Sequence, residues 1–309
     1  AADLEASPPM TDLLRLSPSH GAADLVAQPL FWQALVQQAH DLLTVHSAIP
    51  AEVHYLADIR RWVLIQMAIA LHLEHQRDAT QPMLSPKSLL SALDGTGIAS
   101  RNTVQAFMRE LARVQFTAAP AQSAIRQRAP KVSEKSEKLM QIYLDIHLRA
   151  LDTVDGGDRR AFLHQWPRFL SYLQPAFARR ICKSSAWYTP PPAIQGFTNA
   201  ASGSSILHDL VLATEQRAPD AEGKIWIGAV SAAVLAKRYQ VSPAHVARML
   251  SRARGLGAMG WGEAARRKEC WLSASLAQAY LLWQSEKLSV LSDAFCEAAA
   301  AFLAAQVAT

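Results

Sequence analysis

The sequence predicts a mainly helical fold that contains an internal repeat, and the clearest evidence is a pair of matching segments. Residues 100–111 and 242–253 overlay when the numbering is shifted by 142. Each segment opens with a serine, a residue type that favours the N-cap of a helix. The apolar positions then coincide, at spacings of three and four residues that form one buried helix face. The coinciding pairs are Val104 with Val246, Phe107 with Met249, Met108 with Leu250 and Leu111 with Ala253.

The surroundings of these two helices also match. A short helix is expected before each of them, over 87–93 and 231–239. A basic, turn-rich segment of hairpin length follows each, over 117–132 and 255–271. Helix, tight turn, capped helix and basic hairpin is the order of a winged helix-turn-helix, whose second helix enters the major groove of DNA. The sequence therefore predicts two winged helix-turn-helix modules with small β-wings on a helical scaffold, related as a pseudo-two-fold repeat.

The first half of the chain is expected to be an arm followed by helices. Residues 1–28 contain Pro, Ser and Asp without a sustained period, which is typical of a poorly ordered arm. Asp155-Gly-Gly-Asp158 is the strongest helix-breaking sequence near the middle, so it divides the chain into a first winged-helix half, 29–154, and a second, 155–309. Outside the first module, helical periodicity covers 30–45, 56–76 and 134–151.

The second half repeats this plan. A helix over 160–182, bent at Pro167 and Pro175, leads into a connection rich in Pro, Ser and Gly over 183–203. Further helices are expected over 205–217, 275–287 and 291–307. Strands are expected only as short pieces, in the first wing and over 224–227, 259–261 and 270–272.

The charge distribution points to a phosphate-bearing partner. The chain carries a formal net charge of +5, with a sequence pI of about 9.2. Residues 1–55 hold one basic residue and six acids, whereas residues 224–268 hold nine Lys or Arg against Glu263 alone. Basic residues gathered around an expected wing are typical of a nucleic-acid-binding face. The sequence therefore predicts double-stranded DNA as the partner.

The first capped helix carries side chains suited to reading bases. Behind Ser100 at its N-cap, four polar residues fall opposite the apolar face: Arg101, Asn102, Gln105 and Arg109. Arg can pair with guanine, and Asn or Gln with adenine, and each bidentate pair discriminates by about 1–3 kcal/mol. Three basic residues of the following wing are expected at phosphates or in the minor groove: Arg126, Arg128 and Lys131.

The second capped helix differs at the equivalent positions. Behind Ser242 these positions are small: Pro243, Ala244, Ala247 and Ser251. Its long polar side chains are turned to the flank, where we expect phosphate contacts from His245, Arg248 and Arg252. The wing that follows adds Arg266, Arg267 and Lys268, and its two arginines are expected in the minor groove. We therefore expect an asymmetric operator, read strictly by the first helix and loosely by the second.

No catalytic residues, metal site or cofactor are expected, so the sequence does not predict an enzyme. The three cysteines, Cys182, Cys270 and Cys296, are far apart and lack a C-x-x-C spacing. Residues 255–260 spell G-x-G-x-x-G, but a helix rather than a strand precedes them, so we interpret them as the turn into the wing. Without a signal peptide or an apolar span of 18 residues, a cytoplasmic protein without membrane contact is expected.

Tryptophan is frequent, with eight in the chain. Those that we single out all lie outside the wings, in the scaffold or its connections: Trp32, Trp62, Trp166 and Trp187. Core packing is one interpretation. The other is a pocket for a small apolar or aromatic effector, located between the scaffold and the reading helices, because aromatic side chains commonly line small-molecule sites.

In its order of flanking helix, helix-turn-helix, basic wing and closing helix, the chain resembles MarR-type winged-helix repressors over most of residues 30–305. Members of that family are normally homodimers held by terminal helices. The resemblance therefore implies a single-chain pseudo-dimer, monomeric in solution, that represses transcription until a small molecule releases it. The connection 183–203 is longer than is typical of the family. Two alternatives stay open: a DNA-binding protein like plasmid replication initiators, which also carry two winged helices, and a winged-helix interaction module that no longer binds DNA.

Overall fold

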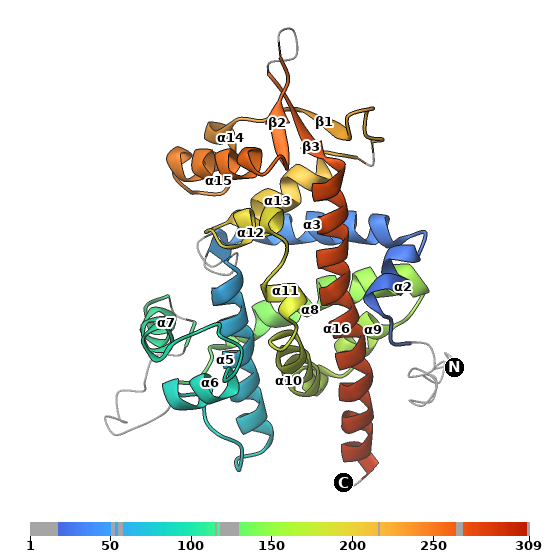
Figure 1. Cartoon of the computed structure of the whole chain (residues 1–309). Helices are drawn as coiled ribbons and strands as arrows, with labels where there is room; N and C mark the ends of the chain where they lie inside the picture. Colours follow the sequence, from blue (N-terminus) through green and yellow to red (C-terminus); the bar gives the residue numbers. More distant parts are fainter. Residues whose placement is uncertain are drawn as a thin grey trace.

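The computed structural model is mainly helical with a three-stranded antiparallel sheet, as the sequence predicts at that level (Figure 1). The structure describes residues 18–50, 53–54, 58–114, 116–117, 130–215, 217–263 and 268–307. The helices in the first part are α2 (Ala22–Ala27), α3 (Phe31–Ala48), α5 (Ile59–Arg77), α6 (Pro86–Ala92), α7 (Arg101–Arg113) and α8 (Glu134–Asp155). Those that follow are α9 (Arg159–Gln165), η1 (Pro167–Phe169), α10 (Leu170–Ile181), α11 (Ser185–Tyr188), α12 (Pro192–Thr198), α13 (Gly203–Leu212), α14 (Ala232–Arg238), α15 (Pro243–Gly255) and α16 (Ala274–Val307).

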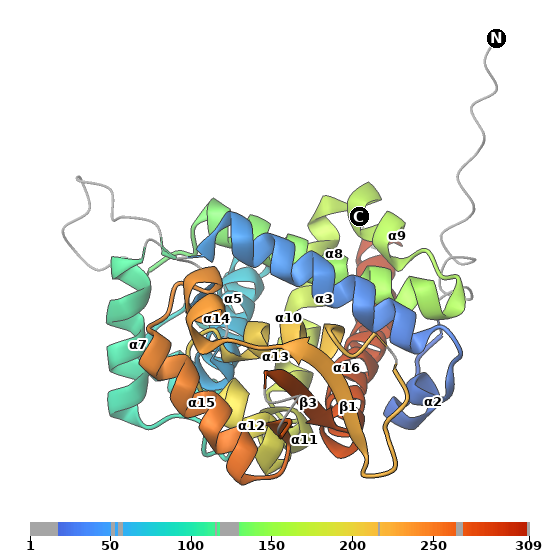
Figure 2. The ribbon, with the colours of Figure 1, turned by 90° about the horizontal axis from the view of Figure 1, so that it is seen from above.

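The centre of the molecule is a helical core to which both predicted halves contribute. Helix α5 is buried on nearly all sides, and its first turn is capped by Asp58, whose side chain accepts hydrogen bonds from the backbone N–H groups of Arg60 and Arg61. Helix α10 packs against both α5 and α16, while α3 packs against α8 and α13 (Figures 1 and 2). Apolar side chains from before and after residue 155 therefore belong to one continuous core.

The long helix α16 corrects the prediction of two terminal helices. It runs unbroken for 34 residues, because residues 288–291 contain neither Gly nor Pro and both Leu288 and Leu291 are buried. By length and composition α16 is the one candidate membrane span among the described residues. The sequence analysis did not expect an apolar span of this length. In this fold α16 packs against α2, α10 and β3, and it buries the polar side chains of Gln284 and Lys287.

Three other expectations change locally. Within the arm predicted to be irregular, α2 forms and packs on α16, with Leu25 completely buried. The helix predicted over 160–182 breaks at Trp166, because the following proline, Pro167, disfavours helical backbone at the residue before it. The connection 183–203 contains α11 and α12, and Pro192 stands in the first turn of α12, where its missing N–H costs no hydrogen bond.

The sheet joins β1 (Lys224–Ala229), β2 (Met259–Trp261) and β3 (Glu269–Ser273) in the order β1-β3-β2. The three strands agree with the sequence prediction, β1 and β3 being slightly longer. All pairings are antiparallel, and β3 lies in the middle, so that Leu272 faces Ile225 on one side and Met259 on the other. The register shifts between Trp226 and Gly228, a bulge at which Gly228 takes φ +83°, a backbone region that favours glycine.

The predicted break near residue 155 ends α8 and is held by a buried arginine. Gly156 closes the helix with φ +71°, the left-handed C-cap that glycine favours. Arg159 is fully buried, and its guanidinium donates to Asp152 Oδ1 at 3.1 Å and to Asp155 Oδ1 at 2.9 Å and Oδ2 at 2.7 Å. It also donates to the carbonyl of Pro18 at 2.8 Å, which ties the chain before α2 to the α8–α9 turn.

Candidate functional site

The first candidate element is α7, whose two faces differ as the sequence predicts. The Ser100 hydroxyl accepts a hydrogen bond from the Thr103 N–H at 3.3 Å, which caps the helix. Val104, Phe107 and Leu111 are buried against α5 and α6. The four predicted reading residues are exposed on the other side: Arg101, Asn102, Gln105 and Arg109. The structure therefore brings these four side chains together on one free face of a capped helix.

The second candidate element is α15, which is built in the same way. The Ser242 hydroxyl accepts from the His245 N–H at 3.2 Å. The apolar side chains equivalent to those of α7 are buried: Val246, Met249, Leu250 and Ala253. The small residues predicted on the opposite face are exposed, together with two arginines: Pro243, Ala244, Ala247, Arg248, Ser251 and Arg252.

His245 departs from the expectation of a surface residue. It is only partly exposed, and its Nε2 lies 3.1 Å from the Ala201 carbonyl, just before α13. The stem of Arg252 passes close to Gly196 in α12, 3.6 Å from where a Cβ there would stand. This flank of α15 is therefore turned toward the body of the molecule at His245 and along the stem of Arg252, whereas both Arg248 and Arg252 remain exposed overall.

The wings lie only partly within the described residues. Arg126, Arg128, Arg266 and Arg267 fall outside them. Lys131 and Lys268 are exposed; Lys131 directly precedes Val132 of the bridge described next, and Lys268 directly precedes β3. Thr117 and Val132 form an isolated antiparallel bridge after α7, whereas β2 and β3 form a longer ladder after α15.

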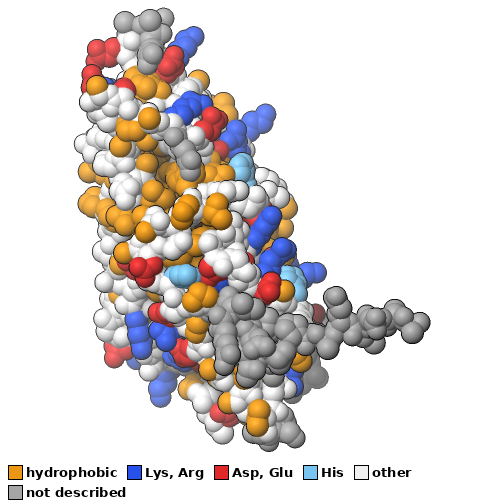
Figure 3. Space-filling view, turned by 90° about the vertical axis from the view of Figure 1, so that its right-hand side faces the viewer, with side chains coloured by type: hydrophobic (Ala, Val, Ile, Leu, Met, Phe, Trp, Pro, Cys, Tyr) orange, Lys and Arg blue, Asp and Glu red, His pale blue; other side chains and the backbone are white. Residues whose placement is uncertain are grey.

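Helices α7 and α15 lie toward the same side of the molecule, at the left in both Figure 1 and Figure 2. Figure 3 views the opposite side. Apolar side chains gather in the upper part of that face, and basic and acidic groups are interspersed elsewhere, without one continuous basic area. Because α7 and α15 share one side of the molecule, that side is the candidate for an extended contact.

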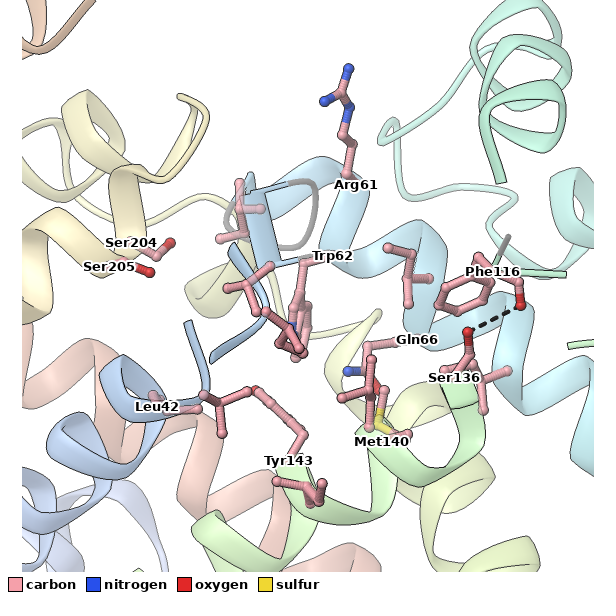
Figure 4. A pocket seen from close by; sticks show the side chains of 18 of the residues that line it. Leu42, Arg61, Trp62, Gln66, Phe116, Ser136, Met140, Tyr143, Ser204 and Ser205 are labelled. Carbon is pink, nitrogen blue, oxygen red and sulfur yellow. Dashed lines mark hydrogen bonds between the residues drawn. The ribbon is translucent and has the colours of Figure 1, made fainter. Parts of the chain in front are cut away.

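A cavity of about 360 Å³ lies between α7 and the core. Its walls come from α3, α5, α8, α11, α13 and α16, and α7 contributes Phe107, Glu110 and Leu111. In Figure 4 the Trp62 ring points into the cavity from α5, whereas Arg61 on the same helix points away from it. The Ser136 hydroxyl donates to the Phe116 carbonyl at 3.1 Å, which fixes the start of α8 at the rim (Figure 4).

Two of the four predicted pocket tryptophans, Trp62 and Trp187, line this cavity. Their ring centroids are 5.4 Å apart. Trp32 and Trp166 are not among its lining residues: they pack elsewhere on the apolar core. The sequence analysis missed Trp283 on α16, which stacks on Trp187 with centroids 4.4 Å apart and planes within 5°. The one available signal was its place on an apolar helix.

The polar groups around the cavity are unusual for an apolar site. Burial, together with the positive charge of Lys287, lowers the pKa of His208 to about 3. His208 Nδ1 lies 2.6 Å from the Tyr280 hydroxyl. Lys287, which is 2% exposed, has its Nζ 5.0 Å from the Trp187 ring centroid and 5.9 Å from that of Tyr143. Sequence reasoning missed both His208 and Lys287.

Comparison with protein-family models, with curated proteins and with solved structures finds no match for this chain. Its function is therefore inferred from the geometry of the two capped helices and the cavity.

Proposed function

We propose that this chain is a DNA-binding transcriptional regulator, a repressor that contacts one operator with two non-identical winged-helix heads. The first head is defined here as residues 86–132 and the second as 203–273. The observation that carries the proposal is the second head, where α13, β1, α14, α15, β2 and β3 follow one another with sheet order β1-β3-β2. Residues 239–242 join α14 to α15, a connection of the 3–4 residues found in helix-turn-helix motifs.

The first head also supports the proposal, although its described residues form fewer elements than those of the second head. Helix α6 precedes α7, and the bridge between Thr117 and Val132 closes the segment that follows. Its helix connection, 93–100, is longer than in the second head. In favour of base reading, Asn102 and Gln105 are exposed, and they are residue types that recognise adenine.

The proposed mechanism assigns different tasks to the two heads. Helix α7 reads bases in a major groove, and α15, with its small outer residues and Arg248, contributes affinity through phosphate. A small molecule in the cavity would contact α7 from the inside and change how the heads are spaced. We further propose that the protein is a cytoplasmic monomer of MarR-like design, without cofactor or catalytic activity, whose partner is double-stranded DNA.

Selection of bound sequences from a random double-stranded DNA library tests this function. We expect a site with one strictly and one loosely specified half. Asn102→Ala and Gln105→Ala should each relax base preference at one or two positions of the strict half, at a cost of about 1–3 kcal/mol. Arg248→Ala should weaken binding to all sequences alike and flatten the salt dependence, as loss of one phosphate contact does.

The matched control is Arg168→Ala, an exposed arginine in η1 that lies outside both heads. Its DNA affinity and salt dependence should equal those of the wild type. Two equally constrained inverted half-sites would contradict the asymmetric assignment. Absence of binding even at low salt would overturn the DNA-binding proposal and favour the protein-interaction module, because phosphate contacts strengthen as salt falls.

A further inference from the structure

Lys287 is a buried cation that faces the cavity, and no acidic side chain among the described residues forms an ion pair with it. It lies in the middle of α16, and its Nζ lies over the rings of Trp187 and Tyr143. Transfer of an ammonium group from water to an apolar site is costly unless it is paired. Ring faces attract a cation, but they replace only part of its hydration. Burial lowers the pKa of Lys287 to about 7, and no acidic group opposes that shift.

The groups around Lys287 are neutral or positive. His147 on α8 and His208 on α13 have pKa values lowered by burial and by the charge of Lys287 itself. Burial raises the pKa of the phenols of Tyr143 and Tyr280, so both stay uncharged. The acid among the lining residues is Glu110, and it pairs with Arg61 at 3.6 Å and Arg113 at 4.0 Å.

A second observation concerns hydrogen-bond donors at the same wall. Trp187 lines the cavity, and its buried indole Nε1 has no partner among the described residues. An indole N–H donates hydrogen bonds and cannot accept them, and the same holds for an ammonium group. Both groups therefore need an acceptor, and a buried donor left unpaired costs free energy that a suitable ligand would recover. Trp62, Trp187 and Trp283 offer apolar ring surface for the rest of such a ligand.

We propose that this cavity binds an apolar organic acid, whose carboxylate pairs with Lys287 and whose hydrocarbon or aromatic body lies against the tryptophan rings. A volume of about 360 Å³ suits a ligand of that size, since small-molecule sites span about 300–1,000 Å³. The acid would be the effector of the regulator proposed above, and in that respect the inference rests on the proposed function. Binding of the acid, however, can be measured without DNA.

Isothermal titration calorimetry with matched probes tests the assignment. The probes are octanoate and 3-phenylpropionate, each compared with its primary amide, which has the same shape but no charge. We expect the wild type to bind at least one acid about tenfold or more tighter than its amide, as loss of a hydrogen bond to a charged group implies. Lys287→Met should remove this difference while still binding the amide, because the apolar walls remain.

Two further measurements separate pairing from a merely structural role. At about pH 8, binding of the acid should take up protons in the wild type, because an anion favours the charged form of Lys287, and Lys287→Met should take up none. Trp187→Phe keeps the ring and removes the unpaired donor, so it should weaken acid binding more than amide binding. Lys138→Met, on the exposed face of α8, is the control and should bind both probes as the wild type does.

The calorimetric and DNA-binding results together separate the ligand assignment from the proposed function. Equal affinity for acid and amide, unchanged acid binding in Lys287→Met, or no binding of either acid at millimolar concentration would overturn the inference. If an acid binds through Lys287 but the protein binds no DNA, the site stands and the regulatory function fails. If DNA binds and both acids fail, only the ligand assignment falls. When both bind, octanoate or 3-phenylpropionate should change DNA affinity in the wild type and not in Lys287→Met.

Discussion

Arg159 offers the sharpest test of how this fold is held together, because removing its guanidinium takes the arginine charge away from the carboxylates of Asp152 and Asp155. Backbone N–H groups and His20 then remain as their contacts. The side chain is fully buried and lies 2.7–3.1 Å from oxygens of Asp152 and Asp155. Removing one partner of a buried ion pair costs about 3–5 kcal/mol. We therefore expect Arg159→Met to lower the free energy of unfolding at neutral pH by about that amount.

Urea unfolding followed by circular dichroism measures this change. With an m value of about 3 kcal/mol/M, the midpoint should fall by about 1–1.7 M. The control is Arg160→Met: Arg160 bonds Asp145 at 2.8 Å, but its side chain is 47% exposed. Exposed pairs contribute about 0–1 kcal/mol, so this midpoint should move by about 0.3 M or less.

A combined variant checks the cause of the loss. Adding Asp152→Asn and Asp155→Asn to Arg159→Met should recover part of the stability, because the two carboxylate charges that lost the arginine are then gone. Equal, small shifts of the urea midpoint for Arg159→Met and Arg160→Met would refute the reasoning. Burial would then make no difference to how much an ion pair contributes to stability.

Two further predictions concern a close contact and a buried histidine. Gly203→Ala should strongly lower the melting temperature, because the added Cβ would stand 1.8 Å from the Phe197 carbonyl oxygen. The control Gly255→Ala, whose Cβ would meet nothing within 4 Å, should be neutral or slightly stabilising. Similar melting temperatures for the two variants would count against the contact. Burial lowers the pKa of His46 to about 4, so the unfolded chain binds a proton first as the pH falls below about 6.5, and about 3 kcal/mol of stability should be lost by about pH 4. His46→Gln should flatten that slope in urea titrations at several pH values, and an unchanged slope would exclude His46 as its cause.

The two capped helices could be predicted because their signals are local. Serine at the N-cap and apolar residues three and four apart specify a helix and its buried face, and Val104 and Val246 are buried as expected. The breaker after Asp155 and the strand at Met259–Trp261 were likewise found from neighbouring residues alone.

The cavity could not be predicted in the same way, because it forms from distant segments. Trp187 and Trp283 stack although 96 positions separate them, and no local pattern encodes that distance. Lys287 would be expected at a surface, since lysine is rarely buried. Its burial depends on α8 and α11 packing against α16, and the inward turn of His245 depends in the same way on the backbone at Ala201.

Helix α16 begins at Ala274, directly after the last residue of β3, with no loop between sheet and helix. At 1.5 Å per residue, its 34 residues form a rod about 50 Å long, and Trp283 and Lys287 lie about 15–20 Å along it. A rod without a hinge transmits rotation rather than absorbing it. A rotation of the β-sheet would therefore rotate the part of α16 that forms the cavity wall by a similar angle. A molecule bound against that wall would in turn resist rotation of the sheet.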